Sequence, residues 1–150
     1  MPSFPLARIA LIFLVCVFAG LAQPAKTSAS TPTRAEKALI YAINNARDNH
    51  GARRLRVGAT IQEGAHNWAH YLLVHDSFYH ARISTSGVSE NLAWLTCRSG
   101  WARTIVRMWL ASPVHRATLL DRSATRLGAG VARGSWRGYS CVRIAVARFR

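Results

Sequence analysis

Two histidines and one glutamate are the side chains in this 150-residue sequence that are best placed to do chemistry. His80 follows two aromatic residues, Glu90 begins the run Glu-Asn-Leu-Ala, and His115 lies in the run Ser-Pro-Val-His-Arg. Two imidazoles and one carboxylate can form an open metal site with water in the remaining position. The same side chains can instead form a hydrogen-bonded cluster that holds loops together, and their types alone do not choose between these two arrangements.

A second histidine pair lies on a predicted helix. His66 and His70 are four residues apart, a spacing that can present two imidazoles to one metal. Asn67 follows His66 where a metalloprotease of the HExxH type would have its glutamate base. Both histidines fall opposite the apolar stripe of the helix, so we interpret them as part of a solvated polar face.

Other reaction classes find no support in the sequence. It contains no GxSxG nucleophile motif and neither of the glycine-rich phosphate motifs, GxxxxGK[ST] and GxGxxG. The formal charge of +14 indicates attraction to anionic envelope polymers or lipids, and it equally provides solubility. No nucleic-acid-reading motif accompanies this charge, so nucleic acid is not an expected partner.

The N-terminus has the features of an export signal. Residues 9–22 form an uncharged apolar run after Arg8 and end in Gly20-Leu21-Ala22. The run is shorter than the about 20 residues that a membrane-spanning helix needs. We therefore predict a signal peptide over 1–22, a flexible polar leader over 23–33 and one domain over 34–150. An uncleaved membrane anchor is the alternative; after cleavage no stable transmembrane span would remain.

Export changes how the three cysteines are interpreted. Cys16 leaves with the signal peptide, so Cys97 and Cys141 remain. Two cysteines in an exported chain pair readily, and we predict a disulfide between them. Two free thiols or a metal pair are the alternatives, although the spacing fits no zinc signature.

Apolar periodicity and helix-start signals indicate an α+β domain that positions these residues. Capping boxes at Thr33 with Glu36 and at Thr60 with Glu63 predict the first two helix starts. Further helices are expected over 100–111 and from Pro113 onward, the latter capped by Ser112. A hairpin with strands over 127–133 and 139–149 follows, and its last strand alternates so that one face is buried.

Several short motifs occur in an order that resembles a known family. They are Ala65-x-x-Trp68-Ala69, Phe78-Tyr79-His80, Glu90-Asn91-Leu92-Ala93, Trp109-Leu110-x-Ser112-Pro113-x-His115-Arg116 and Leu127-Gly128-x-Gly130-Val131. This order resembles the SCP-like or CAP domain of cysteine-rich secretory proteins, antigen 5 and plant pathogenesis-related proteins. It is most similar to the short bacterial extracellular branch, and the resemblance covers about residues 35–149.

The resemblance implies a three-layer α-β-α sandwich with a small antiparallel sheet between helical layers. It also implies a central cavity lined by His80, Glu90 and His115, which in some members binds Zn²⁺ or another divalent cation. Asn91, Trp109 and Ser112 are the residues expected to support this cavity. Ser112 stands where many eukaryotic members have a second glutamate, so the fourth cavity group is absent, and Ser89 replaces the usual glycine before the glutamate.

The expected function is a secreted binding or interaction module at the cell envelope or outside the cell. Lipid, an anionic envelope polymer or another protein are the partners considered, and enzyme activity is not the first expectation. One alternative is a metal-dependent hydrolase with Glu90 as ligand or general base. Another is a cationic scaffold in which the histidine cluster is structural. A hydrolase needs a metal with an open position, whereas a lipid binder needs an apolar groove.

Overall fold

The computed structural model describes residues 31–83 and 87–150. The elements are α1 (Arg34–Asn49), β1 (Arg56–Val57), α2 (Ala59–Val74), β2 (Ser89–Thr96), α3 (Trp101–Ala111), α4 (Pro113–Leu120), β3 (Arg126–Trp136) and β4 (Tyr139–Phe149). The predicted signal peptide and the leader up to residue 30 lie outside the described residues, so both stay predictions. Within the described part, no helix is long and apolar enough to cross a bilayer.

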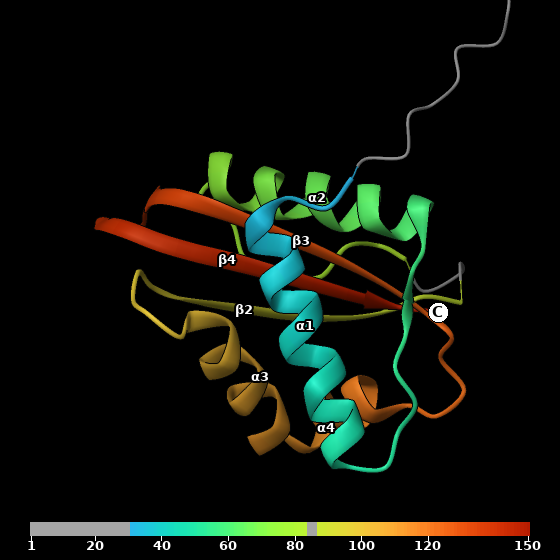
Figure 1. Cartoon of the computed structure of the whole chain (residues 1–150). Coiled ribbons are helices and arrows are strands. Elements are labelled where there is room, and N and C mark those ends of the chain that lie inside the picture. The colour runs from blue at the N-terminus through green and yellow to red at the C-terminus, as the bar shows by residue number, and fades with distance from the viewer. Residues whose placement is uncertain (1–30, 84–86) are drawn as a thin grey trace, which may run out of the picture.

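Three layers make up the fold, as the resemblance implied (Figure 1). The sheet has the order β1-β3-β4-β2, with α2 on one face and α1, α3 and α4 on the other. The sheet is mixed, because the two residues of β1 pair in parallel with β3 while the remaining pairs are antiparallel. The α-β-α sandwich is thus confirmed, with a short parallel addition at one edge.

The two helix starts that were predicted from capping boxes differ in outcome. At α1 the Thr33 hydroxyl accepts a hydrogen bond from the Glu36 N–H at 3.3 Å, and the Glu36 carboxylate accepts one from the Thr33 N–H at 2.8 Å. That capping box is confirmed. The one at Thr60 is wrong, because α2 begins at Ala59 with Gly58 as its N-cap and no side-chain cap. Thr60 therefore lies inside the first turn, where its hydroxyl cannot take the capping position.

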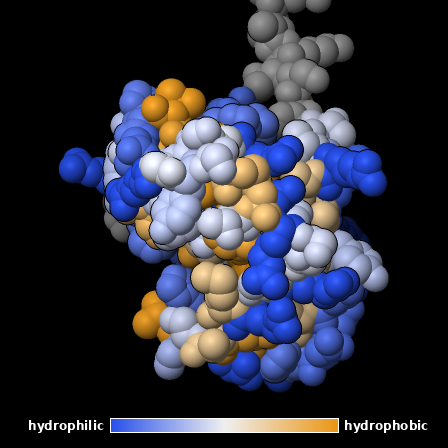
Figure 2. Space-filling model, turned by 90° about the vertical axis from the view of Figure 1, so that its left-hand side faces the viewer, coloured by the Kyte–Doolittle hydropathy of each residue, from blue (hydrophilic) through white to orange (hydrophobic). Residues whose placement is uncertain are grey.

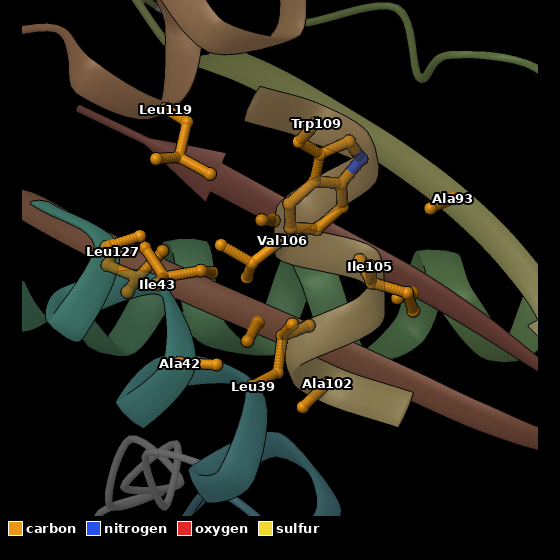
Figure 3. Close-up of a cluster of buried hydrophobic side chains, with 14 of the residues drawn as sticks. Leu39, Ala42, Ile43, Ala93, Ala102, Ile105, Val106, Trp109, Leu119 and Leu127 are labelled. Carbon is orange, nitrogen blue, oxygen red and sulfur yellow. The ribbon is translucent and has the colours of Figure 1, made fainter. Parts of the chain in front are cut away.

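Strand β4 is buried on both faces, although the alternation of its residues predicted burial of one face only. Val142, Ile144 and Val146 pack toward α2, while Ala145 and Ala147 pack toward the other helical layer, and all five are fully buried. The difference arises because β4 is an inner strand with helices above and below it. Figure 3 shows the larger core, in which α1 and α3 contribute most of the labelled side chains.

Residues 89–96 form β2, which the sequence pattern did not predict as a strand. Leu92 and Trp94 belong to the cluster on the α2 side, whereas Ala93 belongs to the cluster on the α3 side. Apolar residues on both faces remove the alternation that reveals a strand facing one core. β2 is an edge strand, so the backbone edge that faces away from β4 has no neighbouring strand in the sheet.

Helix α2 lies so close to β3 that two glycines of the strand have no room for a side chain. A Cβ on Gly130 would lie 1.9 Å from the backbone carbonyl oxygen of Ala65, and one on Gly128 would lie 2.3 Å from that of Ile61. Because backbone atoms cannot yield as a side chain does, the whole helix would have to move away from the sheet. These two glycines therefore set the spacing between α2 and β3.

Gly130→Ala is expected to lower the free energy of unfolding by about 3 kcal/mol, the upper part of the range for overpacked cores. Urea unfolding followed by tryptophan fluorescence measures the change. Gly134→Ala is the matched control, since its Cβ would meet only the end of the Leu73 side chain, at 3.0 Å. Equal destabilisation by the two substitutions would contradict the close approach of the backbones at Gly130.

The predicted disulfide is confirmed. Cys97 directly follows β2 and Cys141 lies in β4, with their Cα atoms 5.5 Å apart. The Cys97 N–H also donates to the Cys141 carbonyl oxygen at 3.0 Å, which continues the pairing of the two strands. The covalent link therefore closes the end of an existing strand pair.

A buried arginine joins the helices that lie on the α1 side of the sheet. Arg47 is fully buried and donates to the carbonyl oxygens of Arg53, Leu119 and Asp121 at 2.7–2.9 Å. Burial lowers the pKa of its guanidinium from the usual value, and the nearby Asp121 carboxylate opposes this shift. Arg47 thereby fixes the end of α4 and the connector after α1 to the same helix.

Candidate functional site

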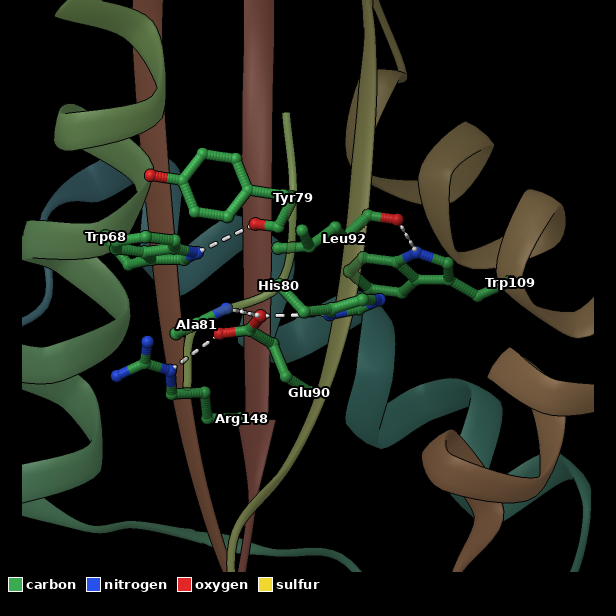
Figure 4. Close-up of polar contacts among 8 residues, drawn as sticks. All are labelled: Trp68, Tyr79, His80, Ala81, Glu90, Leu92, Trp109 and Arg148. Atoms are coloured by element: carbon green, nitrogen blue, oxygen red, sulfur yellow. Dashed lines mark hydrogen bonds and ion pairs between the residues drawn. The ribbon is translucent and has the colours of Figure 1, made fainter. Parts of the chain in front are cut away.

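Glu90 lies at the centre of a hydrogen-bonded cluster on the α2 side of β2 (Figure 4). Its Oε1 accepts the Ala81 N–H at 3.1 Å and lies 3.0 Å from His80 Nδ1, while its Oε2 accepts the Arg148 Nε–H at 2.9 Å. The Glu90 side chain is 2% exposed and that of Arg148 is 10% exposed. This carboxylate is therefore almost fully desolvated and already holds donors at both oxygens.

Strand pairing brings the ion pair together. Glu90 on β2 and Arg148 on β4 are direct partners in the antiparallel register, so their side chains leave the same face of the sheet. Gly64 of α2 makes room for the guanidinium, because a Cβ there would lie 2.4 Å from Arg148 Nη1. The pair is thus enclosed between the sheet and α2.

The segment that carries His80 is fastened to α2 as well as to Glu90. Trp68 Nε1–H donates to the Tyr79 carbonyl oxygen at 3.2 Å (Figure 4). The Tyr79 hydroxyl donates to that of Tyr71 at 3.2 Å. This hydroxyl contact raises the pKa of Tyr79. His80 is 57% exposed in its side chain, so the imidazole lies at the surface of the cluster.

His115 is held from the other side of β2. Its Nδ1 lies 2.8 Å from the Ser112 hydroxyl oxygen, and its carbonyl oxygen accepts the Asn91 Nδ2–H at 2.8 Å. Trp109 Nε1–H donates to the Leu92 carbonyl oxygen at 2.9 Å, which fixes α3 to the strand. Asn91 and Ser112 therefore hold His115, and Trp109 joins α3 to the neighbouring strand; their role in supporting a ligand cavity stays a prediction.

Alternation along β2 turns Glu90 and its neighbour Asn91 to opposite faces of the sheet. Glu90 points toward α2, whereas its neighbour Asn91 points toward the layer that contains His115. Within residues 31–83 and 87–150, no group of three or more His, Cys, Asp or Glu side chains is arranged to hold a metal ion. The arrangement therefore does not fit a three-ligand site made of His80, Glu90 and His115.

The two histidines on α2 lie in different surroundings. His66 Nδ1 lies 2.7 Å from Glu36 Oε1, and the Glu36 side chain is only 1% exposed. The His66 and His70 rings stand 4.6 Å apart between centroids. His70 is exposed as predicted, whereas His66 is 32% exposed in its side chain and contacts a buried carboxylate that α1 supplies.

A pocket of about 400 Å³ follows the open edge of β2. Phe78, Leu92 and Trp94 line it from the α2 side, and Ala93, Met108, Trp109, Ser112 and His115 line it from the α3 side. We call this cavity the β2 pocket. Its walls are mainly aromatic and aliphatic, and the Ser112–His115 pair supplies the polar groups. The volume and this composition are typical of pockets for small ligands.

The sequence analysis did not identify two features of the site, which are the ion-pair role of Arg148 and the apolar lining of the pocket. Arg148 gave a usable signal, since an arginine within an apolar strand requires a buried acceptor. The pocket-lining roles of Phe78, Trp94 and Met108 had no such signal, because apolar residues at regular spacing predict core just as well. Their role depends on β2 being an edge strand.

Comparisons with known proteins agree with this fold. The model of the cysteine-rich secretory protein (CAP) family matches residues 40–147. A search of curated proteins found no match. Among solved structures, an outer surface protein of Borrelia burgdorferi is similar with a TM-score of 0.55 and 18% identity, over 75% of this chain and 89% of that one.

Two further structures are similar at comparable levels. BmVAL-1 has a TM-score of 0.61 and 15% identity, with 82% of this chain and 79% of that chain covered. A cysteine-rich secretory protein of Staphylococcus aureus has a TM-score of 0.54 and 16% identity, with 80% and 41% covered. At these identities the likeness concerns the fold, while the family match spans most of the sequence. The chain belongs to the cysteine-rich secretory protein (CAP) family.

Proposed function

We propose that this protein is an exported binding module that holds a small, mainly apolar ligand group in the β2 pocket. The observation that carries the proposal is the composition of the pocket: apolar walls from both faces of an edge strand, with one polar pair. Apolar surface favours a lipid-like group because burying it releases water. In this arrangement Ser112 and the Nε2 of His115 orient the polar end of the ligand, since His115 Nδ1 is already engaged by Ser112.

The state of Glu90 favours binding over hydrolysis. A general base must be free to take a proton from the attacking water. Both oxygens of Glu90 are instead occupied by donors, including a nearly buried guanidinium at 2.9 Å. We therefore assign the His80–Glu90–Arg148 cluster a structural role, in which it fixes the segment from Phe78 to Ala81 against β2 and so shapes one wall of the pocket.

Two features of the sequence and structure support a location of this module at the envelope or outside the cell. The apolar run over 9–22 has the pattern of a signal peptide, and the disulfide between Cys97 and Cys141 suits an oxidising compartment. The family is described as secretory, and one structural relative is an outer surface protein.

Binding of a fluorescent long-chain fatty acid to the exported protein tests the proposal. Met108 is 46% exposed and lines the pocket, so Met108→Asp places a carboxylate against the apolar part of the ligand. We expect the affinity to fall at least about tenfold, the equivalent of about 1.4 kcal/mol. Fluorescence titration below the micelle concentration of the probe gives the dissociation constants.

Val114→Asp is the matched control for this substitution. Val114 is 76% exposed on the neighbouring helix and does not line the pocket, so it receives the same new charge elsewhere. We expect its affinity to stay within about twofold of the unmodified protein. No binding by the unmodified protein, or equal binding by the Met108→Asp variant, would refute the role proposed for the pocket.

A further inference from the structure

A second hollow lies between α1 and α3 and shares no lining residue with the β2 pocket. It has a volume of about 970 Å³, and we call it the α1–α3 groove. Small buried residues such as Ala42, Ala46 and Val106 lie at its base, which leaves space between the two helices. Longer polar side chains of α1 and α3 stand along its sides.

The charged residues of this groove all have one sign. Arg98, Arg103 and Arg107 line it and are exposed, and no aspartate or glutamate is among the lining residues. Among the described residues, the ion pairs of arginine are those of Arg54 with Asp48 and Arg148 with Glu90. The three groove arginines therefore carry charge that the described part of the fold does not neutralise.

The start of α3 adds to this positive potential. Gly100 is the N-cap, with a left-handed backbone at φ 64°, so it supplies no side chain to the first turn. That turn also lacks an acidic residue. The free N–H groups there carry partial positive charge, which acts together with the arginines rather than as a separate site.

The spacing of the arginines suits a ligand with repeated anionic groups. Arg103 and Arg107 are one helical turn apart, so their Cα atoms are displaced by about 6 Å along the axis of α3. Guanidinium groups bind phosphate through two parallel hydrogen bonds. Asn49 and the side-chain amide N–H groups of Asn45 also line the groove and can bind hydroxyl groups on the units that link successive phosphates, while Thr104 holds the Arg107 guanidinium at 3.4 Å.

We propose that the α1–α3 groove binds a linear phosphodiester polymer of the cell envelope, with Arg98, Arg103 and Arg107 on successive phosphates. Figure 2 shows one face of the molecule, on which strongly hydrophilic side chains are interspersed with pale and apolar areas. The proposal concerns a surface separate from the β2 pocket and goes beyond the function proposed above.

Titration of the exported protein with fluorescently labelled poly(glycerol phosphate) at several salt concentrations tests this inference. In the Arg103→Gln/Arg107→Gln variant we expect at least tenfold weaker binding near physiological salt. Each lost phosphate contact also reduces the release of counterions. The plot of log affinity against log salt concentration should therefore become shallower by roughly 1 to 1.5.

Arg56→Gln/Arg126→Gln is the matched control. These two arginines are exposed partners on β1 and β3, at the other edge of the sheet, and they do not line the groove. The control removes the same charge, and its affinity should stay within about twofold of the unmodified protein. Melting curves of both variants establish that they are folded.

Three results would overturn the proposal. If the two double substitutions weakened polymer binding equally, net charge alone would account for the attraction. Competition by inorganic phosphate as effective as that by the polymer, at equal phosphate concentration, would show that repeated groups are not recognised. Binding to a single-stranded oligonucleotide but not to poly(glycerol phosphate) would assign the groove to a different polymer. None of these results depends on fatty-acid binding, so the two proposals fail separately.

Discussion

Replacing Glu90 with alanine is expected to lower the free energy of unfolding by about 3–5 kcal/mol, the cost of removing one partner from a buried ion pair. The Arg148 guanidinium would stay between the sheet and α2 with its side chain 10% exposed and its carboxylate lost. The Ala81 N–H would also lose its acceptor, which releases the segment that carries His80. Urea unfolding monitored by circular dichroism measures the difference.

Asp48→Ala is the control, because it removes one partner of a solvent-exposed ion pair. The Asp48 and Arg54 side chains are 45% and 48% exposed, so we expect a loss of at most about 1 kcal/mol. Adding Arg148→Met to Glu90→Ala should restore about 1–3 kcal/mol, because the buried unpaired charge is then removed. If Glu90→Ala cost no more than Asp48→Ala, the Glu90–Arg148 pair would not be the buried contact described above.

Removing the disulfide with Cys97→Ser/Cys141→Ser is expected to cost about 4 kcal/mol. The cysteines are 44 residues apart, and the estimate is the chain entropy that the unfolded state regains when a loop of this length opens. Denaturant unfolding under oxidising conditions, compared with the unmodified protein, measures the loss. A reduced melting temperature should accompany it.

Reductant separates the disulfide from the serine substitutions themselves. The reduced unmodified protein should unfold near the denaturant concentration of the double variant, whose own midpoint should not respond to reductant. Identical midpoints for the oxidised protein and the double variant would contradict a stabilising role of the bridge.

Local signals in the sequence account for several of the helix starts. The capping box of Thr33 and Glu36 predicted the start of α1, and Pro113 predicted the start of α4. The position of Ser112 as N-cap was also correct, although its hydroxyl contacts His115 rather than capping the helix. Such signals succeed because each depends on residues within one helical turn.

Strand β2 is an element that local sequence signals did not predict. Its residues face a different core on each side, so periodicity did not reveal a strand. Its position at the sheet edge, which creates the pocket, depends on pairing with β4 more than 40 residues later. The same pairing turns Glu90 and Asn91 to opposite faces of this strand. The family resemblance implied one cavity for Glu90 and His115, and that implication stays a prediction.

The sequence by itself determined the family through the order of its motifs, the disulfide through its two remaining cysteines, and a strongly cationic surface through its composition. Only the tertiary structure decided what individual arginines do. Arg47 donates to three backbone carbonyl oxygens and Arg148 pairs with Glu90, whereas Arg103 and Arg107 line a groove and form no ion pair with a described residue. The reason is physical: a charge becomes structural or available according to the partners and the solvent around it, and those are set by contacts between distant parts of the chain.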